Sequence, residues 1–339
     1  MTLDGNDVSH PEELINSFQK LKAIGVEGMM VDTWWGITEP DTPQEYNLKG
    51  YRKLFTMIRN TGLKIQAYEQ FMLAFRNEFV GFLLDGTICE LQIGLGPCGE
   101  LRFPSYPARN GWVYPGVGEF QCYDKYFIKN LKDAVVVAGK PDWGTGPSDK
   151  GYNGYYARFF LDWYSGTLLH HAYMILTSTN SVFYAHHIST RVAGIHWHYN
   201  HASHAAELTV GYYNIFGQKG YAPIVDVFKK NRTLLNFTCV ELATVDKDGE
   251  AASDPESLVW QVLNTGWEAG LNVAGENALP CYDRDSYNRI IQNAKRSGII
   301  KHPNGRQLNT FTYLRLGPIL MEKANLDEFA IFVMKMKKA

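Results

Sequence analysis

The sequence has no excess of charge of either sign. It holds 33 Lys and Arg residues against 35 Asp and Glu residues, interspersed along 339 positions, for a net charge of -2. Binding to nucleic acid or to an anionic membrane depends on a concentrated basic surface, so we expect neither partner. An uncharged ligand suits this balance better.

Paired cysteines and long apolar runs are also lacking. Five cysteines lie far apart, in an odd number and without any CxxC pair, which argues against a disulfide framework or a zinc site and favours a reducing compartment. Residues 1–11 lack the pattern of a secretory signal, and no apolar run approaches the length of a membrane span. We therefore expect a soluble intracellular protein, with cytoplasm and plastid both open.

Helical and strand patterns alternate along the chain. Apolar runs predict strands at 26–31, 63–68, 88–94, 191–196, 233–238, 271–275 and 308–314, and helices at 11–25, 49–61, 69–84, 154–178, 221–230, 255–268, 284–295 and 325–337. Continuous apolar strands joined by helices indicate parallel βαβ units. We predict one α/β domain over 1–339, a TIM-type (β/α)8 barrel that is incomplete because seven strands are readable. The Gly- and Pro-rich stretch 139–155 is predicted to be a surface loop.

Polar and aromatic residues collect where the predicted strands end, which is where such barrels place their active sites. They are Asp32, Trp34, Trp35, Glu100, His196, Trp197, Thr238, Glu241, Glu276, Asn277 and Arg315. Glu100 and Glu276 each follow a buried strand, and poor solvation there raises a carboxyl pKa and suits it to proton transfer. Two such carboxylates suggest glycoside hydrolysis. The 14% aromatic content, mostly core, includes rings that could stack on sugars.

Other motifs give weaker predictions. The run Gly94-x-Gly96-x-x-Gly99 fits the dinucleotide fingerprint, but Pro104 and Pro107 exclude the helix that must bind the pyrophosphate. The histidines at 196, 198, 201 and 204 lack an accompanying carboxylate or thiolate shell, which favours hydrogen bonding over metal binding. We therefore expect no cofactor and no metal.

Several long motifs resemble the β-amylase family in its plant form. They are Val31-Asp32-Thr33-Trp34-Trp35-Gly36, the run from Gly94 to Pro107, the run from Gly118 to Tyr126, Gly194-Ile195-His196-Trp197-His198-Tyr199, and Gly275-Glu276-Asn277-Ala278-Leu279-Pro280. The resemblance implies a (β/α)8 barrel that cleaves α-1,4-glucan or maltooligosaccharide from the non-reducing end and releases maltose with inversion, without a cofactor.

By this resemblance, Glu100 matches the general acid and Glu276 the general base. The positions that hold glucose units are matched by Arg191, His196, Thr238, Asn277, Ala278 and Arg315. An inverting enzyme places its carboxyl groups roughly 6.5–9.5 Å apart, with a water beside the base. We expect Glu100 to have the higher pKa and Glu276 to stay ionised.

The sequence departs from the family pattern in three places. The first strand is missing ahead of residue 1, and Asp4 is the nearest match for a sugar-binding aspartate there. A long insertion with a mobile lid is absent after Tyr68, and Arg191 stands in place of a sugar-binding lysine. We expect an open seam between strands 26–31 and 308–314, or residues 1–8 drawn into it. Two interpretations stay open: an active β-amylase, impaired by these losses, and a non-catalytic glucan-binding or regulatory relative.

Overall fold

The computed structural model describes residues 2, 6–33, 35–38, 46–69, 72–107, 110–112, 116–140, 152–215, 219–244, 251–294 and 307–338. Asp4, Trp34 and most of the predicted loop 139–155 lie outside these residues. Among the described helices, none is long and apolar enough to cross a membrane.

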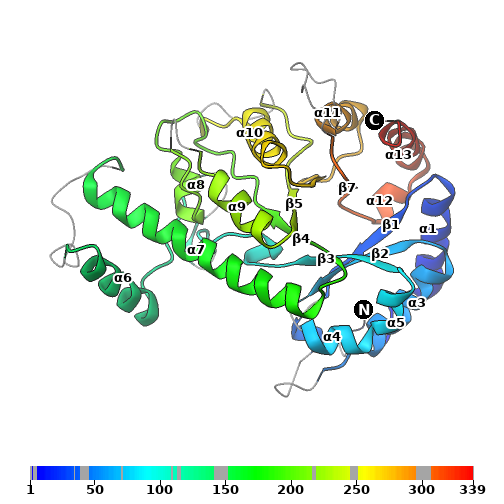
Figure 1. Cartoon of the computed structure of the whole chain (residues 1–339). Coiled ribbons are helices and arrows are strands. Elements are labelled where there is room, and N and C mark those ends of the chain that lie inside the picture. The colour runs from blue at the N-terminus through cyan, green and yellow to red at the C-terminus, as the bar shows by residue number, and fades with distance from the viewer. Residues whose placement is uncertain are drawn as a thin grey trace.

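The described strands form one parallel sheet in chain order (Figure 1). They are β1 (Gly28–Val31), β2 (Lys64–Glu69), β3 (Ile88–Ile93), β4 (His187–Val192), β5 (Thr233–Phe237), β6 (Val273–Glu276) and β7 (Phe311–Thr312). Each strand pairs in parallel with the next, as expected when helices connect consecutive strands. The sheet curls with helices on its outer side, which confirms the prediction of an incomplete barrel.

Most of the helices match the predicted ranges. The larger ones are α1 (Pro11–Ala23), α3 (Lys49–Asn60), α7 (Tyr155–Val182), α9 (Ala222–Lys230), α10 (Pro255–Glu268), α11 (Arg284–Ala294) and α13 (Lys323–Met336). The predicted helix 69–84 divides into α4 (Met72–Glu78) and α5 (Val80–Leu84). The sequence analysis missed α6 (Lys125–Val137). The remaining described elements are short: α2 (Trp35–Thr38), α8 (Ala205–Val210), α12 (Pro318–Met321) and the 3-10 turn η1 (Pro97–Gly99).

The predicted strand 191–196 is wrong by four residues, because β4 ends at Val192. At Gly194 the chain passes so close to the segment after β5 that a β-carbon there would overlap the sulfur of Cys239. This close approach needs glycine, and it takes the apolar run 193–195 out of the ladder. His196 therefore lies in a loop beyond β4.

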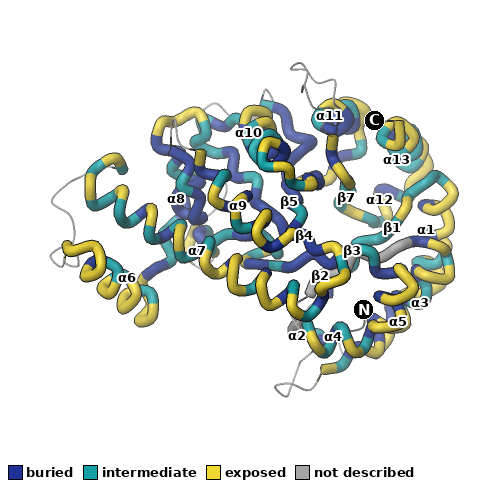
Figure 2. The backbone as a smooth tube through the Cα atoms, in the orientation of Figure 1, coloured by how far each residue is buried: buried dark blue, intermediate teal, exposed yellow. Residues whose placement is uncertain are grey.

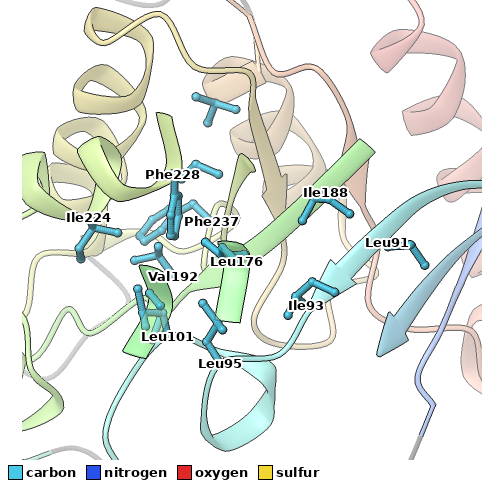
Figure 3. Close-up of a cluster of buried hydrophobic side chains, with 14 of the residues drawn as sticks. Leu91, Ile93, Leu95, Leu101, Leu176, Ile188, Val192, Ile224, Phe228 and Phe237 are labelled. Carbon is cyan, nitrogen blue, oxygen red and sulfur yellow. The ribbon is translucent and has the colours of Figure 1, made fainter. Parts of the chain in front are cut away.

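The main core lies between the outer face of the sheet and the helices. Figure 3 shows Ile188 and Val192 of β4 packed with Leu176 of α7 and with Phe228 and Phe237. Figure 2 shows the same division, with strands β3 to β6 mostly buried and exposed residues on the outer faces of the helices. Because side chains alternate along a strand, residues 189 and 191 of β4 point to the opposite, inner side of the curled sheet. The inner side therefore carries the polar residues of the site.

The two edge strands do not pair. No described residue of β1 is hydrogen-bonded in the sheet to β7, which confirms the expected seam. A second apolar cluster instead joins Leu21 of α1 to Phe329 and Phe332 of α13, with Met29 and Phe311 packed against it. Asn6 and Asp7 bond to Asn47 and Lys53, at the start of α3.

Candidate active site

Glu276 is the last residue of β6 and its side chain is 1% exposed. Two groups approach the same oxygen, Oε2: Arg191 Nε at 3.1 Å and Asn236 Nδ2 at 3.3 Å. Burial raises the pKa of Glu276 to about 7; Arg191 and Asn236 oppose the rise, and the charges of Glu100 and Asp32 add to it.

The expectation that Glu276 stays ionised is therefore wrong at and below neutral pH. Arg191 is a close cation, but the loss of hydration at a fully enclosed carboxylate outweighs its attraction. By the pKa criterion alone, Glu276 would be the proton donor. The family resemblance assigns that role to Glu100, so the two criteria disagree, and an experiment has to separate them.

Glu100 follows η1 in the loop after β3. A β-carbon at Gly96 would overlap the carbonyl oxygen of Arg102, so this loop folds back tightly on itself. The Leu101 amide donates to the Arg191 carbonyl at 2.8 Å, which attaches the loop to β4. The Glu100 side chain is 16% exposed, and its Oε2 lies 2.6 Å from Arg102 Nε. The Gly-rich run thus presents a carboxylate rather than a phosphate-binding helix.

His196 lies in the loop beyond β4, and Thr238 directly follows β5. His196 Nδ1 lies 2.5 Å from Ser253 Oγ, and its ring lies 4.3 Å from the Trp197 ring. Thr238 Oγ1 accepts a hydrogen bond from the Gly194 amide at 2.9 Å. The Thr238 hydroxyl therefore fixes the turn that leads to His196.

Asn277 and Ala278 are held by the protein itself. Asn277 Oδ1 accepts from the Leu314 amide at 2.7 Å, and Nδ2 donates to the carbonyls of Leu279 and Leu314. The Asn277 amide therefore shapes the segment before Arg315. The Arg315 side chain is exposed and makes no hydrogen bond or ion pair within the described part of the chain.

Glu241 anchors the loop after Glu276. Its buried carboxylate accepts from the Ala278 amide at 3.0 Å and from the Leu279 amide at 2.8 Å. The sequence analysis noted Glu241 at a strand end but gave it no role. Asn236 and Ser253 were missed altogether; alternation along β5 could have found Asn236, whereas nothing local marks Ser253.

Two further histidines of this stretch have side-chain partners within the protein. His201 Nδ1 bonds to Ser203 Oγ at 2.7 Å, and His204 Nδ1 lies 2.5 Å from buried Glu207. Within the described ranges, no group of three or more potential metal ligands comes together.

A curled parallel sheet that presents two carboxylates at the carboxyl ends of its strands is the arrangement of a glycoside hydrolase. The model of glycosyl hydrolase family 14 matches residues 3–67 and 64–339, in two pieces that meet within β2. The chain belongs to this family.

Relatives agree with this assignment. The chain is 44% identical to the chloroplastic beta-amylase 2 of Arabidopsis thaliana, covering 98% of this chain and 76% of that protein. It is 36% identical to the beta-amylase of Glycine max, covering 98% and 84%. The catalytic domain of the Paenibacillus polymyxa beta-amylase superposes with a TM-score of 0.84 at 23% identity, covering 98% and 96%, which supports the fold. The chain is a β-amylase-like glycoside hydrolase, a class whose reaction is the hydrolysis of starch.

Proposed function

We propose that this chain cleaves α-1,4-glucans or maltooligosaccharides from the non-reducing end and releases maltose with inversion, with Glu100 as general acid and Glu276 as general base. The observation that carries the proposal is the pair itself: Glu276 is enclosed at the end of β6, close enough to Glu100 for the charge of Glu100 to raise its pKa. The separation of the two carboxyl groups stays a prediction of roughly 6.5–9.5 Å.

The ion pair and the hydrogen bond of Glu276 support its role as base. Arg191 and Asn236 both approach Oε2, whereas no described residue bonds to Oε1. Oε1 is thus the oxygen that would accept a proton from the attacking water. The fraction of Glu276 that is ionised grows as pH rises towards and above 7, so base catalysis grows with it.

Glu100 must carry a proton when the glucan binds. Its Oε2 lies 2.6 Å from Arg102 Nε, so Arg102 fixes the orientation of this carboxyl group. Because the Glu100 side chain is more exposed than that of Glu276, it can exchange that proton with solvent.

We assign glucan binding to His196 and Arg315 through their side chains, and to Thr238, Asn277 and Ala278 through the backbone that they hold in place. Arg315 is exposed and offers several donors to sugar hydroxyls. Residues 1–339 would act as one catalytic domain. The chloroplastic name of the Arabidopsis relative favours a plastid over the cytoplasm, which a fluorescent fusion of the full-length gene product would test.

One observation favours the alternative, a glucan-binding relative with little or no turnover. β2 ends at Glu69 and α4 begins at Met72, so the connection between them at the rim of the barrel is very short. The family match also breaks at residues 64–67. Loops at this rim close over substrates and exclude water, and a short connection would leave the site open.

Maltose release from soluble starch tests the proposal, with Glu100→Gln and Glu276→Gln as controls. We expect both substitutions to reduce turnover by at least about a hundredfold. Starch binding without any turnover in the unsubstituted chain would favour the alternative instead.

Chemical rescue separates the two roles. Glu276→Gly should regain turnover with azide, a small nucleophile that needs no base, and Glu100→Gly should retain turnover on an activated aryl maltoside, which needs no acid. The reverse pattern would show that the acid and the base are exchanged.

A further inference from the structure

One arginine of β4 contacts both halves of the proposed catalytic pair. Arg191 Nε lies 3.1 Å from Glu276 Oε2. Arg191 Nη1 donates to the Cys98 carbonyl at 3.3 Å, in the turn just before Glu100. The carbonyl of Arg191 accepts from the Leu101 amide, just after Glu100. A single residue thus attaches the Glu100 loop to β4 on both sides and also binds Glu276.

The rest of the guanidinium is also enclosed. Nη2 lies 4.0 Å from the Met30 sulfur of β1, and the whole Arg191 side chain is 10% exposed. Little of its surface remains for a glucan. A planar guanidinium has donors on more than one edge and can bind two acceptors at once, whereas a lysine ammonium is a compact point charge. Arg191 is therefore better suited to contacts within the protein than to the role of a sugar-binding lysine.

We propose that Arg191 is a positioning residue, which holds Glu276 and the Glu100 loop in their relative places, rather than a ligand of the glucan. This inference rests on the proposed roles of the two carboxylates. The charge and orientation of the base then depend on Arg191, and so does the pH at which the enzyme works.

The charged and polar groups that face Glu276 come from four elements. They are Arg191 from β4, Asn236 from β5, Glu100 from the loop after β3 and Asp32 from the segment after β1. Arg191 is the one cation among them, and a cation this close lowers a carboxyl pKa by about one to three units. Without Arg191, the charges of Glu100 and Asp32 and the burial of Glu276 remain, and each of them raises the pKa of Glu276.

The test compares the pH dependence of kcat/KM on maltoheptaose for the unsubstituted chain, Arg191→Met and Arg191→Lys. A base works only when ionised, so activity rises with pH through the pKa of Glu276. Arg191→Met should move this acidic limb upward by about one to three pH units and change KM by less than about threefold. Arg191→Lys keeps the charge and should move the limb less, but it should lower kcat because the Cys98 contact is lost. An unmoved limb with a tenfold higher KM in Arg191→Met would make Arg191 a glucan ligand and overturn the proposal.

A second measurement does not depend on turnover. Carboxyl-carbon NMR of glutamate-labelled protein follows the titration of Glu276, identified by the signal lost in Glu276→Gln. Arg191→Met should raise the midpoint by about one unit or more, and an unchanged midpoint would refute the proposal even in an inactive chain. Should Arg191→Met not fold by circular dichroism, the neutral and polar Arg191→Gln replaces it in both measurements. Full activity in Glu276→Gln would instead refute the proposed function, while the NMR result would still decide the role of Arg191.

Discussion

Replacing Glu276 by glutamine should change how the stability of the protein depends on pH. The pKa of Glu276 rises from 4.5 to about 7 on folding, mainly through burial. The folded state therefore binds this proton more tightly than the unfolded state. The wild type is relatively most stable below about pH 4.5 and loses stability as pH rises from there towards 7.

The size of the effect follows from the shift. Each pKa unit corresponds to about 1.4 kcal/mol, so about 3 kcal/mol of unfolding free energy should be lost between about pH 4.5 and pH 7 in the wild type and not in Glu276→Gln. The substitution also leaves Arg191 without its carboxylate partner. That ion pair exists only in the ionised fraction of Glu276, and the attraction of Arg191 is already contained in the pKa of about 7, so its loss adds no separate dependence on pH.

Urea denaturation at a series of pH values from 4.5 to 8 measures the difference. Glu12→Gln removes one exposed carboxylate of α1 and is the control for the change in net charge; its stability curve should run parallel to that of the wild type. Parallel curves for the wild type and Glu276→Gln would refute the reasoning, because they would mean that Glu276 binds its proton equally in both states.

Three further predictions concern the support of the site. Glu241→Gln should lower the unfolding free energy by about 1.5–3 kcal/mol in urea titrations, because the carboxylate that accepts from the Ala278 and Leu279 amides loses its charge; unchanged stability would mean that this loop holds itself in place. Gly194→Ala should cost about 1–3 kcal/mol because its methyl group overlaps Cys239, whereas Gly81→Ala in α5, with open space around it, should cost nothing measurable; equal melting temperatures would argue against the close approach. Ser253→Ala should reduce kcat/KM on maltoheptaose by about tenfold through loss of the bond to His196, with Ser253→Thr largely retaining activity; an equal loss in both variants would point to packing instead.

The sequence analysis missed α6, although an N-cap residue marks its beginning. α6 begins after Asp124, whose carboxylate accepts from the Tyr126 and Phe127 amides, and an aspartate before a run without proline or glycine is a recognisable N-cap. Its apolar residues gave no clear core-facing stripe, since Val136 and Val137 are exposed. The N-cap could have identified this helix, and the periodicity could not.

The sequence determined the number and order of the strands and the placement of the two glutamates. Apolar runs separated by helices produce parallel strands in chain order, and the carboxyl ends of such strands meet at one edge, so Glu100 and Glu276 were predictable as a pair. Only the tertiary structure determined the solvation and the charged neighbours of each glutamate. The pKa of Glu276 depends on burial together with groups from four elements distant in sequence, and the contacts of Arg191 depend on a turn 93 residues away. Solvation and charge are set by the distances between elements, and no local pattern in the sequence encodes those distances.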